Sequence, residues 1–189
     1  MTLPRIIVEE QALEEVSRAW ITPEELTETE HFAPARRREA RAWRYIVRRE
    51  LGRDADIRYN EVGAPYIANY PVHISVSHSK GRVAVAFSNR KCAVDIEQLS
   101  RNFDRVKDHY LSPEEQRLLQ RLPRALATAW SAKETIYKYV GRAGLDLVKD
   151  IRLSVLPDGR LSASLPEGDE LAVGVELHDN EDFVLISIH

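Results

Sequence analysis

The order of its periodic segments constrains the fold of this chain more than any other feature of the sequence. Segments with helical spacing give way to segments that alternate apolar and polar residues, and this succession occurs twice. Alternation is typical of half-buried strands, whereas apolar residues three and four apart are typical of helices. The sequence therefore predicts an α+β fold with two similar halves, each packing helix on an antiparallel sheet. We place these halves at residues 1–97 and 98–189.

Boundary residues support the individual elements. The helical pattern Pro34 to Leu51 begins with proline and is followed by Gly52, as expected from the preference of proline for the first helical position and of glycine for the position after the last. In the first half we also expect helices at 9–20 and from Thr22 onward, and strands at 4–8, 72–77, 82–88 and 91–96. In the second half we expect helices at 112–121 and 124–140, and strands at 150–156, 160–164, 170–177 and 183–188.

Composition excludes several classes of protein. A hydrophobic content of 43% is that of an ordinary folded protein. The one cysteine, Cys92, excludes an intrachain disulfide framework and a cysteine-based zinc cluster. The N-terminal residues do not resemble a secretory signal, and no apolar run approaches membrane-spanning length. We therefore expect a cytoplasmic, monomeric protein that binds neither a membrane nor nucleic acid.

Arginines are concentrated in one helix. Eight of them lie between Arg36 and Arg53, although the net charge of the chain is −3. Such a basic segment predicts a local anion site. On helix 34–51 one face carries Ala40, Trp43 and Val47, and a face about a quarter-turn away carries Arg37, Arg41, Arg44 and Arg48. Two interpretations stay open, because these arginines either line a groove beside the buried stripe or form a solvated charged face.

Three acidic residues from two distant segments are candidate metal ligands. Asp95 and Glu97 are two apart in a predicted strand and so project from the same face. Glu134 lies in the predicted helix 124–140. Carboxylate oxygens are ligands that Mg²⁺ prefers, and it usually binds through a few of them together with substrate phosphates. The alternative is that the Asp-x-Glu pair is simply solvated, which is the commoner case for such a pair alone.

Four further residues are suited to binding phosphates. Ser77 and His78 end a predicted strand, and Lys133 and Lys138 lie on the same helix as Glu134. Each also has a structural interpretation. A His-Ser pair is commonly a turn, and Lys133 can pair with an acid. Lys138 is four residues from Glu134, so the two can form a helix salt bridge worth about 0.2–0.5 kcal/mol.

The order of these motifs resembles the 4′-phosphopantetheinyl transferases, of the longer, surfactin-synthetase-activating type. The matching segments are 74–79 (ISVSHS), 93–97 (AVDIE), 110–115 (YLSPEE) and 130–138 (WSAKETIYK). The resemblance implies transfer of the phosphopantetheine arm of coenzyme A to a serine of an acyl or peptidyl carrier protein, with release of adenosine 3′,5′-bisphosphate. It also implies two α+β halves related by a pseudo-twofold, with the active site at their interface.

The resemblance implies roles for individual residues. Asp95, Glu97 and Glu134 look like the Mg²⁺ ligands, and Glu134 also resembles the base for the carrier serine. Lys138 resembles the cation that stabilises the transferred phosphoryl group. The implied coenzyme A contacts are Ser77, His78, Lys133, Arg37 and Arg41. The chain departs from the family pattern at Ala64, where a lysine is frequent, and at Ala93, where glycine is usual.

Other functions remain to be separated from this one. A non-catalytic coenzyme A- or carrier-binding module of the same fold is one alternative, and an unrelated Mg²⁺-dependent phosphohydrolase is another. Phe103, Tyr110 and Leu111 follow the metal pair and either offer a hydrophobic patch to a carrier or pack in the core. We prefer core packing.

Overall fold

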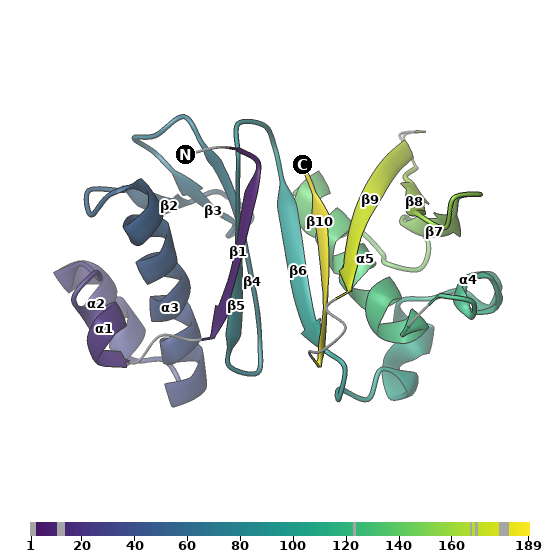
Figure 1. Ribbon diagram of the computed structural model, residues 1–189, viewed down its shortest axis with the longest axis horizontal. Coiled ribbons are helices and arrows are strands. Elements are labelled where there is room, and N and C mark those ends of the chain that lie inside the picture. The colour runs from purple at the N-terminus through teal and green to yellow at the C-terminus, as the bar shows by residue number, and fades with distance from the viewer. Residues whose placement is uncertain (1–2, 11–13, 123, 167, 169, 178–181) are drawn as a thin grey trace. The chain divides into compact units, whose positions relative to one another are not determined.

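The computed structural model describes residues 3–10, 14–122, 124–166, 168, 170–177 and 182–189, and divides into two compact units, Met1–Cys92 and Ala93–His189 (Figure 1). The expected boundary after Glu97 thus differs from the observed one. The reason is strand β6 (Ala93–Gln98), which pairs with the C-terminal strand β10 (Phe183–Ile188) and therefore belongs to the second unit.

The first unit packs a long helix on a three-stranded antiparallel sheet. Its sheet has the order β1-β5-β4, from β1 (Arg5–Glu10), β5 (Arg82–Ser88) and β4 (His73–Ser79). Its helices are α1 (Glu14–Arg18), α2 (Pro23–Glu30) and α3 (Pro34–Leu51). Trp43, Ile46 and Val47 of α3 form a core with Val85 and Phe87 of β5. The sequence predicted the bounds of α3 and β5 correctly because end signals and apolar spacing agree there.

A small hairpin in the first unit was not predicted. Strands β2 (Ile57–Tyr59) and β3 (Pro65–Ile67) pair antiparallel. Three residues are too few to show alternation. The N-terminal helix also differs from its prediction, since β1 continues to Glu10 and α1 begins at Glu14; residues 11–13 lie outside the described part of the chain.

The second unit places one long helix on a five-stranded antiparallel sheet. The sheet order is β6-β10-β9-β8-β7, with β7 (Arg152–Val155), β8 (Leu161–Ser164) and β9 (Glu170–Leu177). The 3₁₀ helix η1 (Asp104–His109), α4 (Pro113–Leu119) and α5 (Ala125–Val140) complete it. Helix α5 contacts β6 and β10. Phe103, Tyr110 and Leu111 are all buried in this core, so the core-packing interpretation of these three residues is confirmed.

The α+β class with antiparallel sheets is confirmed, whereas the pseudo-twofold relation of the halves stays a prediction. Among the described residues, no helix combines the length and the apolar character that a membrane crossing requires.

Candidate active site

Asp95 and Lys138 form an ion pair where α5 packs on β6. The Asp95 side chain is almost fully buried, and its Oδ1 lies 2.8 Å from Lys138 Nζ. Lys138 Nζ also donates to the carbonyl oxygen of Val94 at 3.1 Å. The ammonium group of Lys138 therefore contacts β6, whereas the structural alternative predicted a salt bridge to Glu134 on its own helix. The structure brings together two of the residues to which the resemblance assigns catalysis and metal binding.

Glu97 is held at the other end of the same interface. Its Oε1 accepts hydrogen bonds from Trp130 Nε1 at 2.8 Å and from an Arg101 guanidinium nitrogen at 2.6 Å. Arg101 also lies over the ring of Trp130, 4.5 Å from its centroid. Glu97 and Asp95 are two apart on β6 and face the same helix, as the strand pattern predicts.

Glu134 lies on α5 midway between Trp130 and Lys138, the two residues of this helix that bind Glu97 and Asp95. Trp130, Glu134 and Lys138 are spaced four apart and so form one stripe along the helix. Because the ends of the stripe reach Glu97 and Asp95, its middle faces β6. Burial and the nearby Asp95 charge raise the pKa of Glu134, while Lys138 and Arg101 oppose that shift. This carboxylate is therefore a stronger base than a solvated glutamate.

The three carboxylates are suited to Mg²⁺ in their chemistry but are not gathered around one point. Among the residues that the structure describes, no group of three His, Cys, Asp or Glu side chains could hold a metal ion. Asp95 pairs here with Lys138, and Glu97 pairs with Arg101 and Trp130. The three-ligand set stays a prediction. Burial, and after it the Asp95 charge, raise the pKa of Glu134, and both of these carboxylates are hard oxygen donors of the kind that Mg²⁺ prefers. The donor set fits a magnesium ion on that ground.

Lys133 does not lie with these residues but among other partners, and its role as a coenzyme A contact stays a prediction. Its side chain has no exposed surface, and Nζ lies 2.7 Å from Glu115 Oε1. Nζ also donates to the carbonyl oxygens of Leu147 and Ile151, at 2.6 and 2.8 Å. Burial lowers the pKa of Lys133, and Glu115 opposes that shift. A helix turns about 100° per residue, so adjacent positions 133 and 134 face different surroundings.

Glu115 is a central residue that the sequence analysis did not single out. It completes a capping box with Ser112, whose backbone N–H it binds at 2.8 Å. It also accepts the backbone N–H of Leu153 at 2.9 Å and pairs with Lys133. One carboxylate therefore joins α4, β7 and α5. A serine followed three residues later by glutamate is the signature of such a cap, but nothing in the sequence indicated the two long-range partners.

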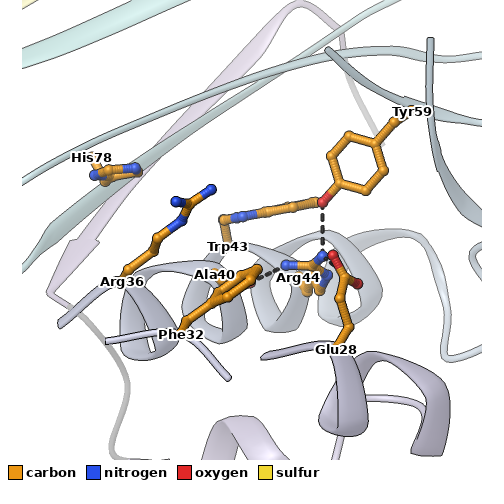
Figure 2. A pocket seen from close by; sticks show the side chains of 8 residues that line it. All are labelled: Glu28, Phe32, Arg36, Ala40, Trp43, Arg44, Tyr59 and His78. Atoms are coloured by element: carbon orange, nitrogen blue, oxygen red, sulfur yellow. Dashed lines mark hydrogen bonds and ion pairs between the residues drawn. The ribbon is translucent and has the colours of Figure 1, made fainter. Parts of the chain in front are cut away.

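Ser77 and His78 lie on opposite faces of β4, as adjacent strand residues must. Ser77 is buried, whereas the His78 side chain is 47% exposed and its Nδ1 lies 3.3 Å from Glu39 Oε2. His78 borders a cavity of about 320 Å³ beside α3 (Figure 2). The lining residues are Glu28, Phe32, Arg36, Ala40, Trp43, Arg44, Tyr59 and His78.

Arg37 and Arg41 do not line this cavity, and their role as coenzyme A contacts stays a prediction. Arg41 is 1% exposed, donates to Thr29 Oγ1 at 2.9 Å and pairs with Glu30 at 2.9 Å. Arg37 pairs with Glu30 as well, at 3.1 Å. Farther along α3, Arg48 makes two hydrogen bonds to Glu25 of α2. Arg44 of the same face lines the cavity, as the groove interpretation expects, whereas Arg41 and Arg48 are buried against the acidic helix α2.

Arg36 is the arginine that accompanies His78. Its guanidinium lies 4.7 Å from the centroid of the Phe32 ring, on the cavity wall (Figure 2). Among the described residues no carboxylate pairs with it. The sequence held a signal for this placement, because Arg36 continues the apolar spacing of Ala40, Trp43 and Val47 toward the start of the helix. It therefore belongs to the sheet-facing stripe.

Comparisons with known proteins match the segment of the chain that carries these acidic residues. Residues 91–186 match a family model described as the 4′-phosphopantetheinyl transferase superfamily. The chain is also 32% identical over 117 residues to a Bacillus subtilis protein named 4′-phosphopantetheinyl transferase, an alignment that covers 58% of this chain and 52% of that protein. The chain thus spans about half the length of this relative. The matched family region contains Asp95, Glu97, Glu134 and Lys138.

Proposed function

This chain belongs to the 4′-phosphopantetheinyl transferase superfamily, and on that premise we propose that it moves the 4′-phosphopantetheine arm of coenzyme A onto a serine of an acyl or peptidyl carrier protein. Adenosine 3′,5′-bisphosphate is the second product. The observation that carries the proposal is the β6–α5 cluster, in which Asp95 binds Lys138 and Glu134 lies between two anchored positions. A carboxylate of raised pKa beside an ammonium group suits proton transfer next to developing negative charge.

The proposed chemistry is displacement at phosphorus. The serine oxygen attacks the phosphorus that bears the pantetheine, and the bond from that phosphorus to the bridging oxygen breaks. Glu134 accepts the serine proton, directly or through a water molecule. Lys138 stabilises the charge on the transferred group. Mg²⁺ held by Asp95, Glu97 and Glu134 would neutralise the pyrophosphate.

We propose that coenzyme A phosphates bind to His78 and Arg36, with Ser77 as an expected further contact. The support is chemical. Arg36 and His78 present a guanidinium and an imidazole to the same cavity, and such groups bind phosphate oxygens. Arg36 replaces Arg37 and Arg41 in this role, because those two are engaged by Glu30.

Substitution of Arg36 should affect coenzyme A binding, whereas substitution of Arg41 should affect stability. Arg36→Ala removes an exposed cation, so we expect the KM for coenzyme A to rise by roughly tenfold, about 1.4 kcal/mol, with no change in melting temperature. Arg41→Ala removes a buried partner of Thr29 and Glu30, so the protein should melt at a lower temperature while KM in the cold stays the same. Steady-state kinetics and thermal melts of both variants test this. If the KM for coenzyme A rises in Arg41→Ala but not in Arg36→Ala, the result would instead support Arg41 as the coenzyme A contact.

The proposed activity is tested by incubating the protein with coenzyme A, Mg²⁺ and a panel of apo-carrier proteins. Intact-protein mass spectrometry should show the mass of one phosphopantetheine arm added to a carrier. Coenzyme A binding without any mass gain across the panel would favour the non-catalytic module. Metal-dependent phosphate release without carrier labelling would favour a phosphohydrolase.

A further inference from the structure

A second cavity lies in the second unit, which also carries Asp95, Glu97 and Glu134. It has a volume of about 590 Å³ and opens between α4 and β7, which Figure 1 shows beside one another at one end of the second unit. We refer to it as the α4–β7 groove. The lining residues are Ser112, Pro113, Glu114, Glu115, Arg117, Leu118, Val148, Lys149, Arg152, Leu153 and Ser154. None of them has a role in the proposed chemistry.

Two exposed arginines and one exposed glutamate, Glu114, give the groove its available charge, which is one positive charge in net. Glu115 on its floor is neutralised by Lys133, and Lys149 lies 3.5 Å from Asp146. Arg117 and Arg152 are exposed, and no carboxylate of the described residues lies within ion-pair distance of either. Nε of Arg117 donates only to the backbone carbonyl of Pro113, at 3.3 Å. Both guanidinium groups are therefore available to an acidic partner.

The groove also presents an apolar contact on a fixed floor. Leu118 is 44% exposed, and Pro113 and Val148 line the same hollow. The floor is fixed because Glu115 binds Leu153 of β7 and the first turn of α4. An exposed leucine and two arginines on one surface have the composition of a protein contact, where an apolar centre has a polar rim.

We propose that the α4–β7 groove docks an acidic segment of the acceptor protein, with an apolar side chain of that segment on Leu118. This inference rests on the proposed function, which requires a protein acceptor. Charge complementarity selects the partner, because Arg117 and Arg152 attract carboxylates. The groove follows β7, and β7 and β6 form the two edges of the five-stranded sheet. Four strand spacings put these edges about 19 Å apart, a distance that a small folded acceptor domain can span.

The test compares two double variants with equal changes in net charge. Arg117→Glu/Arg152→Glu reverses the groove arginines. Arg58→Glu/Arg160→Glu is the control, because both its arginines are more than half exposed and neither lines the groove. For each protein the KM for an apo-carrier, the KM for coenzyme A and kcat are measured at low and high salt. Thermal melts verify that both variants are folded.

We expect the groove variant to raise the KM for the carrier by about tenfold or more, with kcat and the KM for coenzyme A unchanged. Its kinetics should also respond less to salt than those of wild type. Leu118→Ala should raise the same KM alone. An unchanged carrier KM in the groove variant, or an equal rise of that KM in the control, overturns the docking site. If the wild-type protein still labels the carrier, the proposed transferase activity stands in either case. Absence of labelling by wild type overturns both.

Discussion

Glu134→Gln should reduce carrier labelling by about 10²- to 10⁴-fold, the range for loss of a general base, without unfolding the protein. The substitution keeps the shape of a side chain that lies midway between Trp130 and Lys138 on α5, but it removes both the proton acceptor and one metal-ligand charge. The measurement is single-turnover transfer from coenzyme A at saturating Mg²⁺. Glu15→Gln, at an exposed residue of α1 in the other unit, is the matched control and should label carriers at the wild-type rate.

The same variant should be at least as stable as wild type at neutral pH in metal-free buffer. Burial and Asp95 raise the pKa of Glu134 in the folded state. The stability that this group contributes is therefore present below its unfolded pKa and is lost as pH rises through the folded pKa. Thermal melts across pH should show the two proteins converging in acid. Near-normal turnover in Glu134→Gln would refute both its base and its metal roles.

Lys133→Met should lower the free energy of unfolding by about 3–5 kcal/mol, which is on the order of 10 °C in melting temperature for a chain of this size. Methionine leaves the Glu115 carboxylate buried without its cation, and it leaves the carbonyl oxygens of Leu147 and Ile151 without a donor. Breaking one partner of a buried ion pair is costly because the remaining charge stays desolvated. Denaturant unfolding followed by circular dichroism measures the change.

Lys149→Met provides the matched control for Lys133→Met. Lys149 also pairs with an acid, Asp146 at 3.5 Å, but its side chain is 80% exposed. Exposed pairs contribute little, so we expect a change of about 0.5 kcal/mol or less. The KM for coenzyme A of Lys133→Met, measured well below its melting temperature, should equal that of wild type. A raised KM with unchanged stability would instead support the coenzyme A role that the sequence predicted for Lys133.

Local rules predicted the elements well and the side-chain partners poorly. The bounds of α3, β5, β9 and β10 follow from spacing and end signals, which act within a few residues. The same-face placement of Asp95 and Glu97 follows from strand geometry. The contacts of Lys133 and Arg41 do not, because their partners Glu115 and Glu30 are far from them in sequence or on another helix. Such pairings depend on tertiary packing.

The candidate metal ligands show the same division between local and tertiary information. Their residue types and their order predict a carboxylate site at β6 and α5, and that site stays a prediction. No local pattern indicated that Arg101 and Trp130 would bind Glu97, since neither residue had a predicted role. The position of Arg36 could be predicted from the sequence, because its helical spacing places it on the same face of α3 as Trp43.

The packing of α2 on α3 changes how the basic composition of this chain should be understood. Glu25, Glu28 and Glu30 meet the arginines of α3 within the first unit. Much of the positive charge that the sequence concentrates there is thus neutralised before any outside molecule approaches, and the buried pairs are weakly screened by salt. In an electrophoretic or polyanion-binding experiment, the folded protein should therefore behave as far less basic along this segment than a peptide of the same helix.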